Sequence, residues 1–156
     1  MESTAKIPNW NQVSEVELCY KNKVKVADRP RIDSSRTAAE LLRNGWNENT
    51  LDLQERFKVL FLNRSNHVIA GMELSIGGIV GTVADPRLIF VTALKANACA
   101  LIICHNHPSG NLLPSKADEE LTRKIKQGGV LLDIRLLDHV ILTSEGYYSF
   151  ADEGLL

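Results

Sequence analysis

Residues 98–118, ACALIICHNHPSGNLLPSKAD, join an apolar run to two histidines and then to a polar segment interrupted by prolines. The run 100–104 is short and wholly apolar, which is typical of a buried strand. Alternate side chains of a strand point to the same face, so His105 and His107 should face one way and Cys104 the other. The stretch therefore predicts a core strand that ends in two converging imidazoles.

Beyond the turn that follows, Ser115 suits the N-cap of a helix and Asp118 its first turn. Taken alone, these two residues would be only a capping pair, and a single histidine would be a packed or solvated one. Together, the spacing H-x-H-x7-S-x2-D offers three ligands to one zinc ion and leaves a fourth position for water. We therefore predict a Zn2+ site formed by His105, His107 and Asp118.

This pattern resembles the JAMM (MPN+) metalloprotease motif in the form that RadC-type proteins carry. The similarity covers about residues 50–156 and continues downstream at residues 121–122, 137–139 and 147–151. It implies a zinc hydrolase of peptide or isopeptide bonds on a JAMM/cytidine-deaminase-like α-β sandwich. The family's name invokes DNA repair, whereas its motif belongs to zinc hydrolases, so name and chemistry are weighed separately.

Length and composition suit one compact domain, because 156 residues with 44% hydrophobic content can bury an ordinary core. The formal net charge of −1 provides no global field toward nucleic acid or a membrane surface. Three cysteines without paired spacing fit reduced thiols, and we expect none to be a ligand. With no signal-peptide core and no apolar run long enough to cross a bilayer, we expect a cytoplasmic protein.

The remaining pattern predicts an α/β domain in which flanking helices cover a single mixed sheet. We expect a flexible leader over residues 1–12, an amino-terminal strand and helix over 13–50, and the RadC-like JAMM/MPN domain over 51–156. Expected strands are 13–20, 57–62, 68–74, 134–137, 140–143 and 147–150. We expect three helices. The first covers 37–42 and is capped at Ser34-Ser35, and the third covers 115–127 and is stopped by Gly128-Gly129. The second follows Asp85-Pro86, and its inward stripe consists of Leu88, Ile89, Thr92, Ala93 and Ala96.

Hydrolysis also needs a carboxylate that moves a proton without binding the metal, and spacing alone leaves Glu55 and Glu73 open. Glu55 shares strand parity with Phe57, Val59 and Phe61, so burial of that face would aim it inward. The family resemblance likewise implies a catalytic glutamate just before this strand. We therefore predict that Glu55 is the general base and that Glu73 is an ordinary sheet residue.

Ser115 can accept a backbone N–H as a cap and donate its own hydrogen to a developing oxyanion, a second role that the resemblance implies. Asn106 should face away from the ion. Asp138 and His139 are either supports of the ligands or purely structural residues. His67 falls in a hairpin turn, where we expect a solvated ring.

Two other functions remain open. A DNA-repair-associated DNA-binding protein would use Lys21, Lys23 and Lys25 as a phosphate-contacting patch, although lysines on an edge strand also prevent aggregation. A non-catalytic metal-binding scaffold would keep the ligands but lack Glu55 as a positioned base. The leading prediction has a peptide or protein substrate and no membrane partner, and the sequence carries no signal for an oligomeric state.

Overall fold

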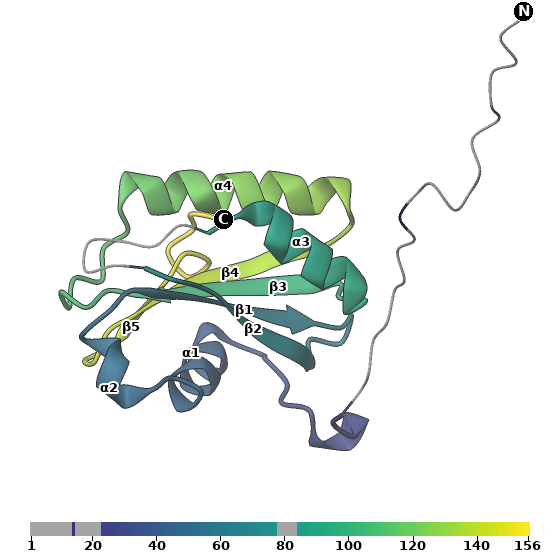
Figure 1. Ribbon diagram of the computed structural model, residues 1–156, viewed down its shortest axis with the longest axis horizontal. Helices are drawn as coiled ribbons and strands as arrows, with labels where there is room; N and C mark the ends of the chain where they lie inside the picture. The colour runs from purple at the N-terminus through teal and green to yellow at the C-terminus, as the bar shows by residue number, and fades with distance from the viewer. Residues whose placement is uncertain (1–13, 15–22, 78–83) are drawn as a thin grey trace, which may run out of the picture.

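The computed structural model describes Ser14 and residues 23–77 and 84–156, and it is one α/β domain built on a five-stranded mixed sheet (Figure 1). Its strands are β1 (Arg56–Leu62), β2 (Val68–Ile76), β3 (Ala100–Asn106), β4 (Arg135–Leu142) and β5 (Tyr147–Ser149). Its helices are the 3-10 helix η2 (Val26–Asp28), α1 (Ser35–Asn44), α2 (Glu48–Leu51), α3 (Pro86–Lys95) and α4 (Lys116–Leu131). The predicted fold class is confirmed, while nearly all of the strand expected over 13–20 lies outside the described residues.

The strand order is β2-β1-β3-β4-β5. Strands β1 and β2 form the predicted antiparallel hairpin around a turn in which the Asn66 N–H donates to the Asn63 carbonyl. Strand β3 pairs antiparallel with β1 and parallel with β4, and α4 makes the crossover between the two parallel strands. Because a crossover helix begins where the first parallel strand ends, the start of α4 lies beside the end of β3.

Each face of the sheet has its own apolar core. Helix α1 packs on one face through Ala38, Ala39 and Leu42, together with Cys104 from β3. Helices α3 and α4 cover the other face. That second core includes the three β1 residues of one parity, Phe57, Val59 and Phe61.

The ends of two predicted elements were wrong. Helix α4 does not stop at Gly128-Gly129 but runs on to Leu131. A Cβ on Gly129 would lie 2.1 Å from the Ile134 carbonyl oxygen, and one on Gly128 would lie 2.7 Å from the Phe90 ring. Both glycines therefore lie inside α4 and let Phe90 and Ile134 approach its backbone closely. The strands expected over 134–137 and 140–143 are one strand, β4, because it pairs along β3 through a single register shift.

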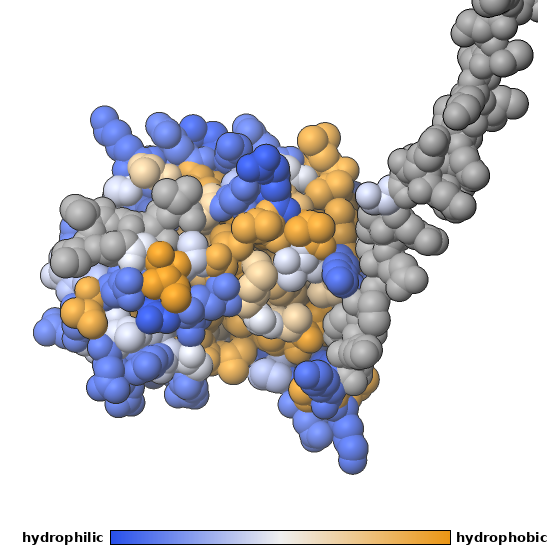
Figure 2. Space-filling view, in the orientation of Figure 1, coloured by the Kyte–Doolittle hydropathy of each residue, from blue (hydrophilic) through white to orange (hydrophobic). Residues whose placement is uncertain are grey.

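Helix α3 begins as predicted, with Asp85 as N-cap and Pro86 in the first turn. Ile89, Ala93 and Ala96 are buried, but Leu88 is 51% exposed and does not belong to the inward stripe. Successive helix positions are 100° apart, so Leu88 turns away from the face that its neighbour Ile89 presents to the sheet. Figure 2 shows apolar surface where α3 and the end of α4 lie. The exposed large apolar residues of these two segments are Leu88, Val91, Leu94, Val130 and Leu131.

Lys23 and Lys25 are exposed on an irregular segment before η2, and Lys21 lies outside the described residues. The two lysines therefore do not lie on an edge strand, so the anti-aggregation role that the sequence suggested for them is wrong. Within residues 23–77 and 84–156, no helix combines the length and apolarity needed to cross a membrane.

Candidate metal centre

Three side chains converge where β3 ends and α4 begins. The Nε2 atoms of His105 and His107 are 2.9 Å apart, and the Asp118 carboxylate oxygens lie 3.3 Å from His105 Nε2 and 3.8 Å from His107 Nε2. These ligand atoms all lie within 4.8 Å of one another, so the group can hold a metal ion. Two nitrogens bound to one tetrahedral zinc are separated by roughly 3.3 Å, which is close to the spacing found here.

Local structure fixes each of these side chains. His105 is almost fully buried near the end of β3, and the N–H of His107, just after the strand, donates to the Leu142 carbonyl of β4. Ser115 is the N-cap of α4, as predicted, and forms a capping box with Asp118. The Ser115 N–H and Oγ–H donate to Asp118 Oδ2 at 2.7 and 2.6 Å, so the capping box also orients the carboxylate.

The second nitrogen of each imidazole also has a partner. His107 Nδ1 lies 2.5 Å from the Asn111 carbonyl oxygen, which can only accept, so His107 carries a hydrogen on Nδ1 and turns its Nε2 to the site. His105 Nδ1 lies 2.8 Å from Nε2 of the fully buried His139. His139 therefore contacts one of the three predicted ligands directly. A hydrogen-bonded outer nitrogen is the usual arrangement of metal-binding histidines.

Burial and charge set the protonation of the cluster. Burial lowers the pKa of His105 to about 4, against the opposing effect of Asp118. The hydrogen bond to Asp118 raises the pKa of His107. Burial favours the neutral form of Asp118 and so raises its pKa. Hydrogen bonds with His107 and Ser115 and electrostatic attraction to His105 outweigh burial, so the Asp118 pKa lies well below its usual range. The metal-free centre is therefore a carboxylate beside one neutral buried imidazole and one imidazole that is readily protonated. A metal ion would displace the proton from His107 Nε2.

Glu55 lies directly before β1 and is half-buried. Antiparallel pairing sets Phe57 opposite His105, so Glu55, two residues earlier, falls at the level of His107. Its negative charge contributes to the raised pKa of His107. The fold thus brings the predicted base, from a distant part of the sequence, to the edge of the three predicted metal ligands.

Asn106 points away from the three ligands, as strand parity suggests, and anchors the segment that carries Glu55. Its Nδ2 donates to the carbonyls of Leu51 and Gln54 at 2.6 and 3.0 Å, and its Oδ1 accepts the Arg56 N–H at 2.7 Å. Asn106 is completely buried. Sequence reasoning missed this function, and the available signal was an amide in a strand whose neighbours are otherwise apolar.

A sequence model of the RadC-like JAB domain matches residues 32–155, about four fifths of the chain. The chain belongs to the RadC-like JAB domain family. It is 56% identical over 101 residues to a UPF0758 protein of Flavobacterium johnsoniae, covering 65% of this chain and 44% of that protein. It is 46% identical over 103 residues to the UPF0758 protein YeeS of Escherichia coli, covering 66% of this chain and 70% of that protein. In the Flavobacterium johnsoniae protein and in other UPF0758 relatives, the matched part spans less than half of the relative's length.

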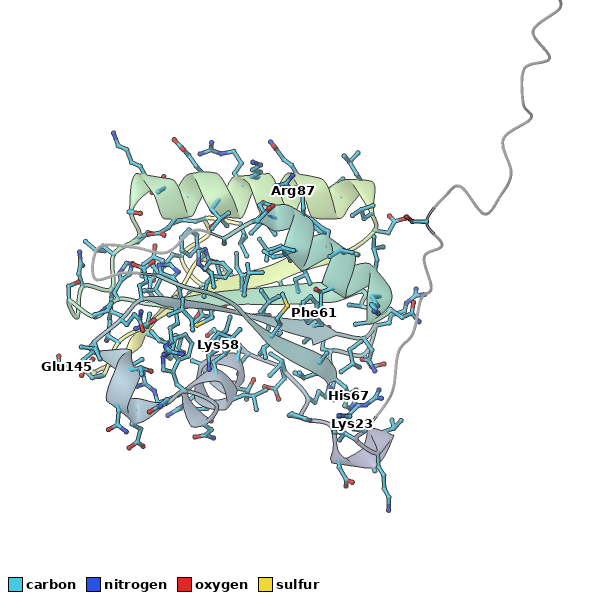
Figure 3. The ribbon with its side chains drawn as sticks, in the orientation of Figure 1. Lys23, Lys58, Phe61, His67, Arg87 and Glu145 are labelled. Atoms are coloured by element: carbon cyan, nitrogen blue, oxygen red, sulfur yellow. The ribbon has the colours of Figure 1, made fainter. Side chains whose placement is uncertain are left out.

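Other predicted residues of this RadC-like JAB domain lie apart from the three ligands. Glu73 forms ion pairs with Arg56 at 3.0 Å and with Lys58 at 3.8 Å, as befits a sheet residue. Lys58 extends toward α1 (Figure 3). His67 sits at the β1–β2 turn (Figure 3), where it is half-buried and not fully solvated as expected, because its segment bridges to Arg31.

Asp138 is buried at the back of β4 and holds the carboxyl-terminal turn. Its carboxylate accepts from Ser149 Oγ at 2.6 Å and from the Ala151 N–H at 3.0 Å. Burial raises the pKa of Asp138 despite these two bonds. In the RadC-like JAB domain, Asp138 therefore stabilises the β5 end of the sheet, whereas its neighbour His139 contacts the predicted ligand His105.

Proposed function

We propose that this RadC-like JAB domain is a zinc-dependent hydrolase of peptide or isopeptide bonds. The observation that carries the proposal is the convergence of His105 Nε2, His107 Nε2 and the Asp118 carboxylate at one point beside Glu55. Three protein ligands leave one position of a tetrahedral ion open, which is typical of catalytic zinc. Bound there, zinc would lower the pKa of water to about 7 and polarise a carbonyl group.

In this proposal Glu55 accepts the proton of the attacking water and later delivers it to the leaving amine. A group with this role must be near the water but must not itself bind the ion. Glu55 meets both conditions because it lies beside His107 and is outside the group of three ligands. The clamp by Asn106 on both sides of Glu55 keeps its backbone fixed relative to β3.

Ser115 is proposed to stabilise the oxyanion. In the substrate-free domain its hydroxyl donates to Asp118 Oδ2, the same oxygen that accepts the Ser115 N–H. When a carbonyl oxygen gains negative charge nearby, the hydroxyl can turn to it while the backbone N–H still holds the carboxylate. A donor placed in this way typically contributes a factor of about 100 to 1,000 in turnover.

The test is a cleavage assay with peptide and isopeptide libraries on metal-stripped and zinc-reloaded protein. Glu55→Gln should keep zinc and lose turnover by about 100-fold or more, because an amide cannot accept the proton. Glu73→Gln is the matched control, since it removes a carboxylate that is ion-paired on β2, and it should retain turnover. Unchanged turnover in Glu55→Gln, or cleavage that persists in chelator, would contradict the proposal.

A further inference from the structure

Three large apolar residues are exposed to solvent around the edge of the predicted metal centre. Leu53, Ile76 and Leu113 are 65%, 54% and 67% exposed. They come from three separate segments, which are the loop between α2 and β1, the end of β2, and the loop that joins β3 to α4. A single exposed apolar residue is ordinary on a protein surface, so the informative feature is that all three border one site.

Leu53 and Ile76 lie on the side of the proposed base. Leu53 precedes Glu55 by two residues, so their Cα atoms are at most about 7 Å apart. Ile76 ends β2, and the N–H of the next residue, Gly77, donates to the Glu55 carbonyl at 2.9 Å. Gln54, between Leu53 and Glu55, donates from Nε2 to the Gly77 carbonyl at 2.7 Å. These two bonds hold the backbone of both apolar residues beside Glu55.

Leu113 lies on the side of the proposed oxyanion donor. It precedes Ser115 by two residues, so the same limit of about 7 Å applies to their Cα atoms. The Leu113 N–H donates to Asn111 Oδ1 at 3.0 Å, and the Asn111 carbonyl accepts from His107. The turn that orients a predicted ligand therefore also fixes the backbone of Leu113.

The proposed chemistry assigns one half of the substrate to each side. Glu55 delivers a proton to the leaving amine, so the amine half of the substrate lies toward Leu53 and Ile76. Ser115 donates to the oxyanion of the acyl half, so that half lies toward Leu113. A large apolar side chain in either half would cover exposed apolar surface of the protein, and removal of that surface from water favours binding.

We propose that Leu53, Ile76 and Leu113 are specificity-determining residues that select a large apolar residue on each side of the scissile bond. This inference rests on the proposed hydrolase function and narrows its substrate class to peptide bonds. In an isopeptide the leaving amine belongs to a lysine side chain. An unbranched chain would then lie beside Leu53 and Ile76, where a peptide substrate places a large apolar side chain.

Peptide titration of the zinc-free chain gives a readout that does not depend on turnover. Short peptides carry Leu-Leu, Leu-Ser, Ser-Leu or Ser-Ser at the centre of a Gly-Ser sequence, and methyl NMR follows Leu53, Ile76 and Leu113. The Leu-Leu peptide should shift these methyl signals and bind about 10-fold or more tightly than the Ser-Ser peptide, because even one methylene group in an apolar site can change discrimination by about that factor.

Cleavage by the zinc-reloaded chain separates the two sides. Mass spectrometry of library products identifies the residue on each side of the cut. Leu113→Ser should lose the preference on the acyl side only, by about 10-fold, and Leu53→Ser or Ile76→Ser should lose it on the amine side only. All three side chains are largely exposed, so serine at these positions should leave the fold intact.

Leu88→Ser is the matched control, because it replaces a leucine that is 51% exposed on α3, away from the metal centre. It should keep the selectivity of the wild type in both assays. Equal binding of the Leu-Leu and Ser-Ser peptides, selectivity that survives in all three rim variants, or cleavage confined to isopeptides would overturn the inference. Selective binding that the rim variants abolish, without cleavage of any peptide, would count only against the proposed hydrolase activity.

Discussion

Ser115 and Ser34 hold the same position in two capping boxes, one at the metal centre and one at the start of α1. Replacing either serine with alanine should lower the free energy of unfolding of the metal-free protein by about 1 kcal/mol, because each removes an N-cap. Only Ser115→Ala should also weaken zinc binding, since only Ser115 donates to a proposed ligand. Urea denaturation and zinc titration calorimetry measure the two effects, and equal zinc affinities of the two variants would be evidence against the orienting role.

At this scale, sequence can predict a ligand set only where the spacing is local. His105 and His107 face one way because they are two residues apart on an extended chain. The anchoring role of Asn106 and the 2.6 Å contact of Thr122 Oγ1 with His139 Nδ1 depend on contacts between distant segments. Neither could be predicted without knowing which strands pair and how α4 lies on β4.

Within helix α4, Gly129 tests whether the Gly-Gly pair serves close packing. Helix propensity alone predicts that Gly→Ala inside a helix stabilises it by about 1 kcal/mol. Gly129→Ala should instead lower the free energy of unfolding by about 2 kcal/mol or more, because the new Cβ would lie 2.1 Å from the Ile134 carbonyl oxygen and the backbone must move.

Gly45→Ala is the control, since a Cβ at the C-cap of α1 would lie 3.7 Å from the Leu41 and Leu42 carbonyl oxygens and the residue has φ −89°. It should change stability by less than about 0.5 kcal/mol. Thermal denaturation of both variants measures these changes in stability. A stabilised Gly129→Ala protein would show that Gly129 is not required for close packing against Ile134.

Caps and hairpin signals are properties of short segments, so Ser34, Asp85 and Ser115 predicted where their helices begin. The ends of α4 and β4 are set by other elements. A Gly-Gly pair is typical of a helix stop, but here Phe90 and Ile134 pack against it from outside the helix. Strand β4 continues where the sequence predicted a break because β3 supplies partners along its length.

For the molecule as a whole, the sheet order brings Glu55, the two histidines and the start of α4 to one edge. Composition and periodicity predicted a mixed sheet with helices, but the position of β1 between β2 and β3 follows from pairing across long sequence distances. Family resemblance, more than periodicity, indicated that Glu55 would lie near the histidines.

The buried histidines predict how global stability depends on pH in the metal-free protein. The pKa of His105 falls from 6.5 to about 4 on folding, and that of His139 falls well below 6.5, in both cases mainly through burial. Below pH 6.5 the unfolded chain thus binds more protons than the folded one, so this stability is complete above about pH 6.5 and is lost toward pH 4. His105 alone predicts a loss on the order of 3 kcal/mol.

His107 acts in the opposite sense, because its raised pKa contributes stability at low pH that is lost as pH rises through the folded value. The two buried rings should dominate, and chemical denaturation in chelator from pH 7 to 4.5 should show falling stability. His67→Gln, which changes a histidine at the β1–β2 turn, should keep this profile. A flat profile would show that the buried rings are not held neutral.

Zinc titration of the metal-stripped protein by calorimetry tests the central claim most directly. The wild type should bind one zinc ion per chain, and Asp118→Asn should weaken binding by about 100-fold or more while keeping the capping position occupied. Asp85→Asn, which changes a helix-capping carboxylate at the N-cap of α3, should bind zinc like the wild type. Failure of the wild type to take up zinc, or equal affinity in Asp118→Asn, would contradict a metal centre at His105, His107 and Asp118.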